Sequence, residues 1–154
     1  MRKTDEIAAD SDVPEGEWSQ RDYQDQADFR CAVRRFVRFA EEQAREKGIT
    51  PQQHVLLVVV RGHASYPRVG IGEIARALQV RQSSASLLVD RCVRRGLLSR
   101  REDVQDRRRA VVSLTEEGQR ILDEIMAANR RELGALREAL FRESFLSAIR
   151  TIPD

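Results

Sequence analysis

Apolar residues recur at helical spacing in two long stretches that flank the centre of this chain. In the first stretch they fall on one face of a helix whose other face is charged, and they are Phe29, Val33, Phe36 and Ala40. This pattern predicts an amphipathic helix over residues 23–47 that ends at Gly48.

The second stretch begins at Thr115, a residue that can cap a helix, and two glutamates follow in the first turn. Its apolar stripe contains Ile121, Leu122, Ile125, Met126, Leu136, Leu140, Phe145 and Ile149. This pattern predicts a helical region that runs to the end of the chain, with Gly134 as a candidate position for a break or kink.

Capping signals decide the structure of a short apolar run, VLLVVV, at residues 55–60. Its β-branched residues would suit a buried strand as well as a helix. Thr50 and Gln53 fit a capping box around Pro51, which is favoured at the first helical position. These signals favour a helix buried on most sides, and the Gly- and Pro-containing residues 61–70 that follow predict a loop.

The central part of the chain contains two short helical patterns, at residues 71–78 and 82–95, joined by a tight turn. Val80 is expected to fill the turn, while Gln79 stands where this motif usually has glycine, so the turn must either avoid a positive φ or accept strain. Residues 97–101 and 109–114 alternate weakly and predict two strands. The order predicts a mostly α (α+β) fold: a winged helix–turn–helix with a two-stranded wing and long N- and C-terminal dimerisation helices.

Composition divides the chain into four parts. Residues 1–20 are polar and acidic and are expected to form a mobile arm. Residues 21–48 would form the N-terminal dimerisation helix, 49–114 the DNA-binding unit and 115–154 the C-terminal dimerisation helices. Residues 61–114 contain 12 arginines and five acidic residues, a net charge of +7, whereas the whole chain has +2. This concentration of positive charge is typical of a nucleic-acid-binding face.

In a helix–turn–helix, the N-terminal end of the second helix meets base edges in the major groove. With Ala85 and Leu88 facing inward, the exposed side chains at that end are expected to be Arg81, Gln82, Ser83, Ser84 and Ser86. Serine and glutamine can hydrogen-bond base edges, and the backbone N–H groups of a helix start favour phosphate. The turn of the wing adds three candidate DNA contacts, Arg107, Arg108 and Arg109.

Six short motifs follow one another in a fixed order. They are Thr50-Pro51-Gln52-Gln53, Gly72-Glu73-Ile74-Ala75, Leu88-Val89-Asp90-Arg91, Arg95-Gly96-Leu97, Asp106-Arg107-Arg108 and Leu114-Thr115-Glu116-Glu117-Gly118. Over roughly residues 25–150 this order resembles the MarR (multiple antibiotic resistance regulator) family of winged-helix repressors. The resemblance implies that Arg108 enters the minor groove and that Asp106 holds the wing arginines in place. Arg81 and Leu87 depart from the residues usual in the family.

The resemblance also implies a homodimer in which the terminal helices interlock and two winged units straddle a pseudo-palindromic operator. The apolar stripes point the same way, because they belong to no obvious core of a single chain. The residues expected in this interface are Phe29, Val33, Phe36, Leu136, Leu140 and Phe145. Trp18 and Tyr23 are interpreted as a strap across the dimer, with a pocket wall as the alternative.

The sequence therefore predicts a homodimeric transcriptional regulator, and a repressor in particular. Its expected partners are double-stranded DNA, a second copy of the chain and a small aromatic or anionic effector that releases it from the operator, although no ligand-binding residue can be assigned. One alternative is a winged-helix module that binds a protein instead of DNA. Another is a repressor that senses oxidants through Cys31, near which several arginines could lower the pKa of the thiol.

Other classes of function find no support in the sequence. Phosphate-binding loops and the GxSxG and HExxH motifs are absent, so neither an enzyme nor a cofactor is expected. Cys31 and Cys92 have no zinc or CxxC spacing, and no metal site is expected. Cys92 is expected in the core, and His54 and His63 in structural or surface roles. With neither a signal peptide nor a long apolar run, the protein is expected to be cytoplasmic and not membrane-bound.

Overall fold

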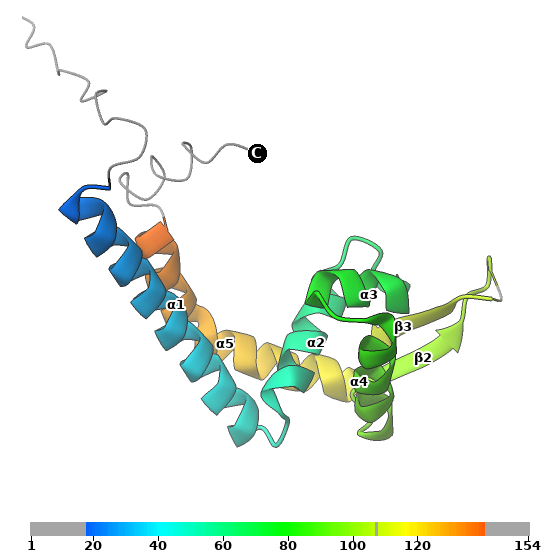
Figure 1. The fold of residues 1–154 in the computed structure, drawn as a ribbon. Helices are drawn as coiled ribbons and strands as arrows, with labels where there is room; N and C mark the ends of the chain where they lie inside the picture. Colours follow the sequence, from blue (N-terminus) through cyan, green and yellow to red (C-terminus); the bar gives the residue numbers. More distant parts are fainter. Residues whose placement is uncertain (1–17, 107, 141–154) are drawn as a thin grey trace, which may run out of the picture.

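The computed structural model describes residues 18–106 and 108–140, which form an L-shaped arrangement of helices with a small sheet at one end (Figure 1). In chain order the elements are α1 (Gln20–Glu46), α2 (Pro51–Gly62), β1 (Val69–Gly70), α3 (Ile71–Leu78), α4 (Gln82–Arg94), β2 (Leu98–Glu102), β3 (Ala110–Leu114) and α5 (Glu116–Leu140). Helices α1 and α5 lie side by side and form what we call the arm. The elements from α2 to β3 form the winged unit.

Reciprocal capping bonds fix where the first two helices begin. Ser19 Oγ accepts the Asp22 N–H at 3.2 Å, and the Asp22 carboxylate accepts the Ser19 N–H at 2.7 Å. Thr50 and Gln53 form the same pair of bonds at 3.2 and 2.9 Å. The capping box at Thr50 and the helix over residues 55–60 are therefore confirmed. Helix α1 begins at Gln20 rather than at Tyr23 as predicted, because the capping box of Ser19 and Asp22 fixes its start earlier in the chain.

The winged unit contains an antiparallel sheet with the strand order β1-β3-β2. Strands β2 and β3 pair from Leu98 opposite Leu114 to Glu102 opposite Ala110. Both predicted wing strands are thus present, although each begins one position later than expected. Strand β1, which places Val69 opposite Val112, was predicted as loop, because two residues are too few to show an alternating pattern.

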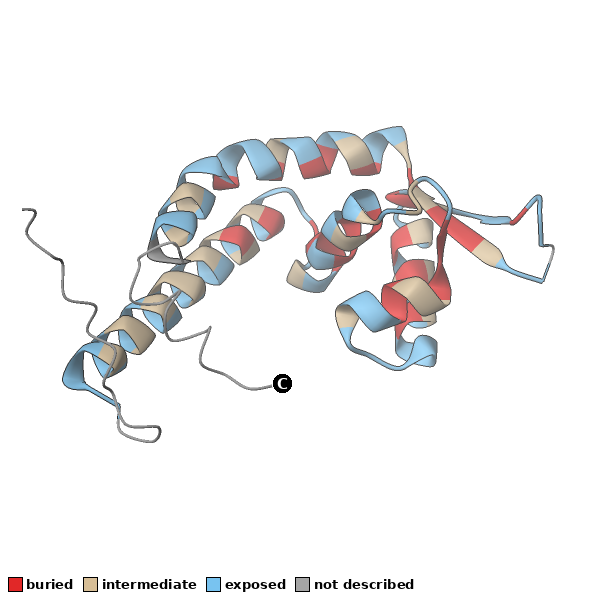
Figure 2. Cartoon of the chain, turned by 90° about the horizontal axis from the view of Figure 1, so that it is seen from above, coloured by how far each residue is buried: buried red, intermediate tan, exposed pale blue. Residues whose placement is uncertain are grey.

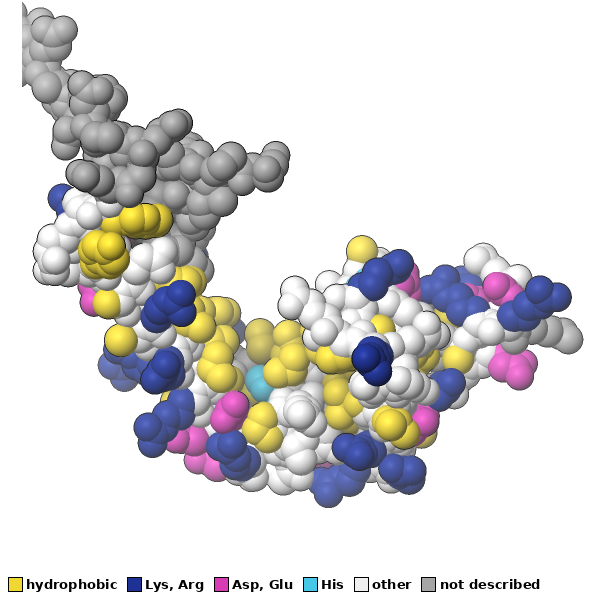
Figure 3. All heavy atoms as spheres, viewed as in Figure 1, with side chains coloured by type: hydrophobic (Ala, Val, Ile, Leu, Met, Phe, Trp, Pro, Cys, Tyr) yellow, Lys and Arg dark blue, Asp and Glu magenta, His cyan; other side chains and the backbone are white. Residues whose placement is uncertain are grey.

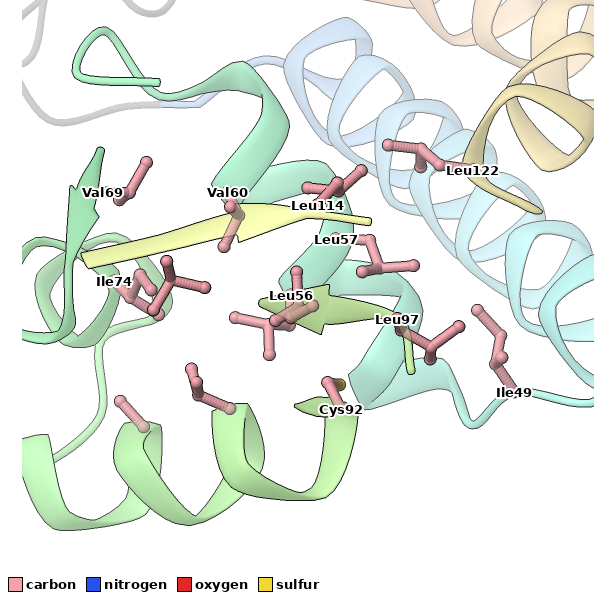
Figure 4. Close-up of a cluster of buried hydrophobic side chains, with 14 of the residues drawn as sticks. Ile49, Leu56, Leu57, Val60, Val69, Ile74, Cys92, Leu97, Leu114 and Leu122 are labelled. Atoms are coloured by element: carbon pink, nitrogen blue, oxygen red, sulfur yellow. The ribbon is translucent and has the colours of Figure 1, made fainter. Parts of the chain in front are cut away.

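One hydrophobic core holds the winged unit together and joins it to the arm (Figure 4). Leu56, Leu57 and Val60 of α2 are fully buried in it. The other elements contribute Ile74, Val89, Cys92, Leu97, Val112, Leu122 and Ile125. Burial is concentrated in the winged unit and the adjoining end of the arm, and along α1 only Ala40 and Ala44 are buried (Figure 2).

The turn between α3 and α4 keeps the helix–turn–helix geometry without glycine. Gln79 adopts the left-handed conformation with φ 55° and ψ 41°, so the turn accepts strain rather than avoiding the positive φ. Val80 does not fill the turn as expected, since it is 44% exposed. The first helix is instead held against the second by buried Ile74 and Ala75 of α3 and Ala85 of α4.

The start of α5 is tied to the chain segment that follows α4. The Thr115 N–H donates to the Leu97 carbonyl at 3.1 Å, and Thr115 Oγ1 donates to the Gly96 carbonyl at 2.6 Å. Thr115 Oγ1 also accepts the Gly118 N–H at 3.0 Å, which confirms Thr115 as a capping residue. Helix α5 then runs through Gly134 to Leu140, so the expected break at Gly134 is not observed.

Gly118 should tolerate no side chain, because a Cβ placed there would lie 2.0 Å from the Leu97 carbonyl oxygen. We expect Gly118→Ala to lower the free energy of unfolding by at least about 2 kcal/mol, since backbone atoms must move apart. The measurement is chemical denaturation followed by circular dichroism. Gly62→Ala is the control, because a Cβ at Gly62 meets no atom within 4 Å. Equal stability of both variants would contradict this view of the junction.

Candidate DNA-binding interface

The N-terminal end of α4 presents polar side chains to solvent while the rest of the helix is anchored in the core. Ala85 and Val89 are fully buried, and Gln82, Ser83 and Ser84 are exposed. Arg81 is the N-cap residue, but its side chain makes no capping hydrogen bond, and no acidic residue occupies the first turn. The positive end of the helix dipole therefore faces solvent without a neutralising carboxylate of its own helix.

Asp106 shapes the turn of the wing through the backbone. Its Oδ1 accepts the Arg108 N–H at 3.0 Å, and its carbonyl oxygen accepts the Arg109 N–H at 2.9 Å. The side chain of Arg108 is left exposed at the end of the turn. Asp106 thus supports the wing by fixing the main chain, rather than by an ion pair with an arginine side chain of the described residues. Arg107 lies outside the described residues.

A groove with a volume of about 720 Å³ separates the N-terminal ends of α3 and α4 from the wing. The predicted contact residues that line it are Gln82, Ser83, Ser86, Arg108 and Arg109. Arg81 and Ser84 are exposed but do not line the groove. The structure therefore brings part of the predicted set together on one concave surface, which we call the reading groove.

Two arginines that the sequence analysis missed also line the reading groove, Arg76 of α3 and Arg100 of β2. Arg76 lies on the first helix of the motif, where an exposed arginine gives no distinguishing signal. Arg100 is held in place by an ion pair with Asp90 of α4 at 2.8 Å. The alternation of side chains along a strand could have predicted that Arg100 faces α4. It could not have predicted the ion pair with Asp90, because that contact depends on how α4 packs on the sheet.

Arg109 differs from Arg108 in having a protein partner. Its guanidinium donates to Glu73 Oε2 at 2.5 Å. Glu73 Oε2 also accepts the Gly70 N–H at 2.7 Å, and Oε1 accepts the Ser65 hydroxyl at 3.1 Å. The backbone N–H of Gly70 is the main cause that lowers the pKa of Glu73, and the Ser65 hydroxyl and the Arg109 charge lower it further. Glu73 is therefore an ionised partner for Arg109 at neutral pH.

A hollow between the arm and the winged unit is lined largely by hydrophobic side chains (Figure 3). Helices α2 and α5, which pack against each other, each bury one polar atom without a hydrogen-bond partner. These atoms are Nε2 of His54 and Oδ1 of Asn129, on residues only 6% and 3% exposed. Burial lowers the pKa of His54, so its imidazole is neutral at neutral pH. His63 has a structural contact, since its Nδ1 accepts the Ser65 N–H at 3.1 Å.

The apolar stripe on α1 is only partly covered within the chain. Phe29, Val33 and Phe36 are half-buried, and the same holds for Leu136 of α5. Three further apolar side chains that were not predicted in the interface are exposed, namely Val37, Met126 and Leu133. Of the other predicted interface residues, Leu140 ends α5, its side chain is not described, and Phe145 lies outside the described residues.

The remaining sequence candidates have simple environments. Trp18 and Tyr23 are exposed at the start of the chain described here. Cys92 is fully buried, as predicted, and burial raises the pKa of its thiol to about 11, whereas Cys31 is exposed. Within residues 18–106 and 108–140, His, Cys, Asp and Glu side chains form no group that could hold a metal ion. No helix in these ranges has the length and apolar character needed to cross a membrane.

A polar helix start beside an arginine-bearing β-hairpin defines the class of winged helix–turn–helix DNA-binding proteins. The model of the MarR family matches residues 47–109. The HTH-type transcriptional repressor MdtR of Bacillus subtilis is 30% identical over 107 residues, which are 70% of this chain and 67% of that protein. The chain therefore belongs to the MarR family.

Solved structures agree on the fold. MepR of S. aureus in complex with DNA is 22% identical, with a TM-score of 0.63, and the match covers 87% of this chain and 93% of that one. BpsR of Bordetella bronchiseptica, whose DNA binding is regulated by 6-hydroxynicotinic acid, is 21% identical, with a TM-score of 0.59 and coverage of 79% and 84%. The winged-helix fold class is confirmed.

Membership of this family makes the protein a DNA-binding transcriptional regulator. The prediction that it is not an enzyme is likewise confirmed, because its relatives are regulators of transcription.

Proposed function

We propose that the protein is a homodimeric repressor that binds a pseudo-palindromic operator and leaves it when a small aromatic or anionic molecule binds. In this proposal residues 49–114 read DNA, and residues 21–48 and 115–154 hold two copies together. The observation that carries it is the reading groove, in which the start of α4 and the wing face one concave, arginine-rich surface.

The start of α4 enters the major groove in this proposal. Gln82, Ser83 and Ser84 are exposed there, Ser86 lines the groove, and the side chains offer both donors and acceptors to base edges. Arg81 lies at the N-cap, where it can reach a phosphate. The wing places Arg108 against the adjacent backbone or minor groove, with Asp106 holding the turn. Arg107 is assigned to the same surface from its sequence position.

Two copies are needed because one reading groove covers only half of a palindromic site. Helices α1 and α5 leave Val37, Met126 and Leu133 exposed and Phe29, Val33 and Phe36 half-buried. Apolar surface of this kind on adjacent helices is typical of a stable homodimer interface. A two-fold axis through the arm would set two α4 helices about one DNA turn, roughly 34 Å, apart.

The effector is proposed to bind in the hollow between the arm and the winged unit. Its apolar lining suits an aromatic ring. The regulation of BpsR by 6-hydroxynicotinic acid supports an aromatic anion as the kind of molecule. An effector acts only if it binds the DNA-free arrangement more tightly than the DNA-bound one.

The wing contact is tested by Arg108→Ala. We expect specific binding to weaken by about 1–3 kcal/mol and the slope of log K against log salt concentration to fall by about one, because one phosphate-directed charge is lost. Binding is measured by fluorescence anisotropy on a duplex selected from random sequences with the unchanged protein. Arg94→Ala is the control, because Arg94 is exposed at the far end of α4. If both variants bind alike, the wing makes no specific contact. A binding curve insensitive to salt would favour the alternative of a protein-binding module.

The dimer is tested by Phe36→Glu, which places a charge in the half-buried stripe of α1. We expect the unchanged protein to be a dimer and the variant to be a folded monomer at micromolar concentration, measured by light scattering and circular dichroism. Gln24→Glu adds the same charge at an exposed position of α1 and should leave the dimer intact. A stable, folded monomer of the unchanged protein would contradict the proposed assembly.

The signal is tested with Cys31→Ser, because Cys31 is the exposed thiol of the described residues and Cys92 is buried. We expect aromatic acids to release DNA from both the unchanged protein and the variant, and peroxide to release neither. The measurement is anisotropy of the bound duplex over a panel of aromatic acids and over peroxide concentrations. Release by peroxide from the unchanged protein alone would make Cys31 the switch.

A further inference from the structure

Two ion pairs anchor the two strands of the wing to one short segment, residues 68–73. Arg68 donates to Asp103, which follows β2 and whose side chain is 6% exposed. Arg109, which precedes β3, donates to Glu73 on the other side. Strand β1 lies within this segment and pairs with β3. These contacts hold the two strands at the point where they enter the wing turn, and Val104 and Arg108 beyond that point are exposed.

Glu73 is the point at which the wing meets the helix–turn–helix. It belongs to the first turn of α3 and accepts hydrogen bonds from Gly70, Ser65 and Arg109. The Arg109 guanidinium also lies against the bare backbone of Gly70, since a Cβ there would be 2.8 Å from its Nη2 and 2.9 Å from its Nε. The side chains of Arg109 and Glu73 are 43% and 21% exposed, so the pair is partly shielded from solvent.

We propose that Arg109 is a positioning residue and not a DNA contact: its ion pair with Glu73 sets the distance and angle between the wing and α4. This inference rests on the proposed DNA-reading role of that groove, and it gives Arg109 a role other than the direct DNA contact predicted from the sequence. Arg108 and the start of α4 must fit neighbouring grooves of the duplex at the same time. A wing whose turn end is free to move loses affinity, because binding must then select one of many wing positions.

Glu73→Gln separates the ion pair from the capping role. The amide oxygen of glutamine can still accept the Gly70 N–H, as in a capping box, but the carboxylate that accepts the Arg109 hydrogen bond is gone, while the nearby charge of Asp103 remains. Arg109→Gln removes the other partner. We expect each change to weaken binding to the selected duplex by about tenfold. The double variant should bind no worse than either single variant, because both changes break the same interaction.

The salt dependence separates positioning from phosphate contact. Arg109→Gln should leave the slope of log K against log salt concentration unchanged, while Arg108→Gln should reduce it by about one. The effects of Arg108→Gln and Glu73→Gln on the free energy of DNA binding should be additive, because Arg108 contacts DNA whereas Glu73 positions the wing. Thermal unfolding of each variant shows that the loss of binding does not follow from unfolding.

A direct readout of wing position comes from spin labels at Val104→Cys and Leu87→Cys in a Cys31→Ser background. Val104 is 94% exposed near the wing turn and Leu87 is 60% exposed on α4, so labels there disturb no packing. Without DNA, the distribution of label distances should be narrow in this background and clearly broader with Glu73→Gln. Arg109→Lys, which keeps the charge, should stay close to the narrow distribution.

Two results would overturn the proposal. A smaller salt slope in Arg109→Gln, together with unchanged or tighter binding of Glu73→Gln, would make Arg109 a phosphate contact that Glu73 restrains. Unchanged binding and label distances in every Glu73 and Arg109 variant would mean that the pair positions nothing. In both cases a strong effect of Arg108→Gln would leave the DNA-reading role intact, whereas its absence would remove that role as well.

Discussion

Burial of α2 is the interaction on which the rest of the structure depends. Leu56, Leu57 and Val60 are fully buried, and they share one core with α3, α4, the sheet and α5. Burying side chains of this size contributes about 1.5–3 kcal/mol each, so the loss of α2 would remove a large part of the energy that holds these elements together. The same helix begins at a strong cap and carries His54, whose buried Nε2 has no partner.

Three contacts connect the arm to the segment at the C-terminal end of α4 and to the start of α5. Gly118 of α5 packs on the carbonyl of Leu97, directly after α4, and Lys47 pairs with Glu124 at 2.7 Å where the arm meets the winged unit. The Arg95 guanidinium also donates to the carbonyl of Gly48 at 2.6 Å. These contacts tie the C-terminal end of α4 to the arm. In the proposed dimer, a ligand that releases them would change the separation of the two α4 helices, and an operator with a fixed half-site spacing would then bind less tightly.

The charged residues of the winged unit divide into those that are paired and those that are exposed. Arg68, Arg100 and Arg109 form ion pairs with Asp103, Asp90 and Glu73, and in the proposal these pairs hold the wing in place. Arg108 is exposed at the wing turn, beside the start of α4. The net charge of the unit creates attraction for DNA, while the paired arginines fix the geometry in which the exposed groups meet it. The net charge of the winged unit does not distinguish arginines held in ion pairs from arginines that are exposed.

The sequence by itself determined the local features of this protein. Thr50, Thr115 and Gly48 marked helix ends because caps depend on a few neighbouring residues, and the order of helices and strands followed from apolar periodicity. The tertiary structure alone decided the contacts between distant segments. Strand β1 exists only through its pairing with β3, Gln79 is held in a left-handed conformation by the packing of α3 on α4, and Arg109 faces Glu73 because the wing folds back over α3. Local patterns cannot encode such contacts, since their energy depends on which remote groups folding brings together.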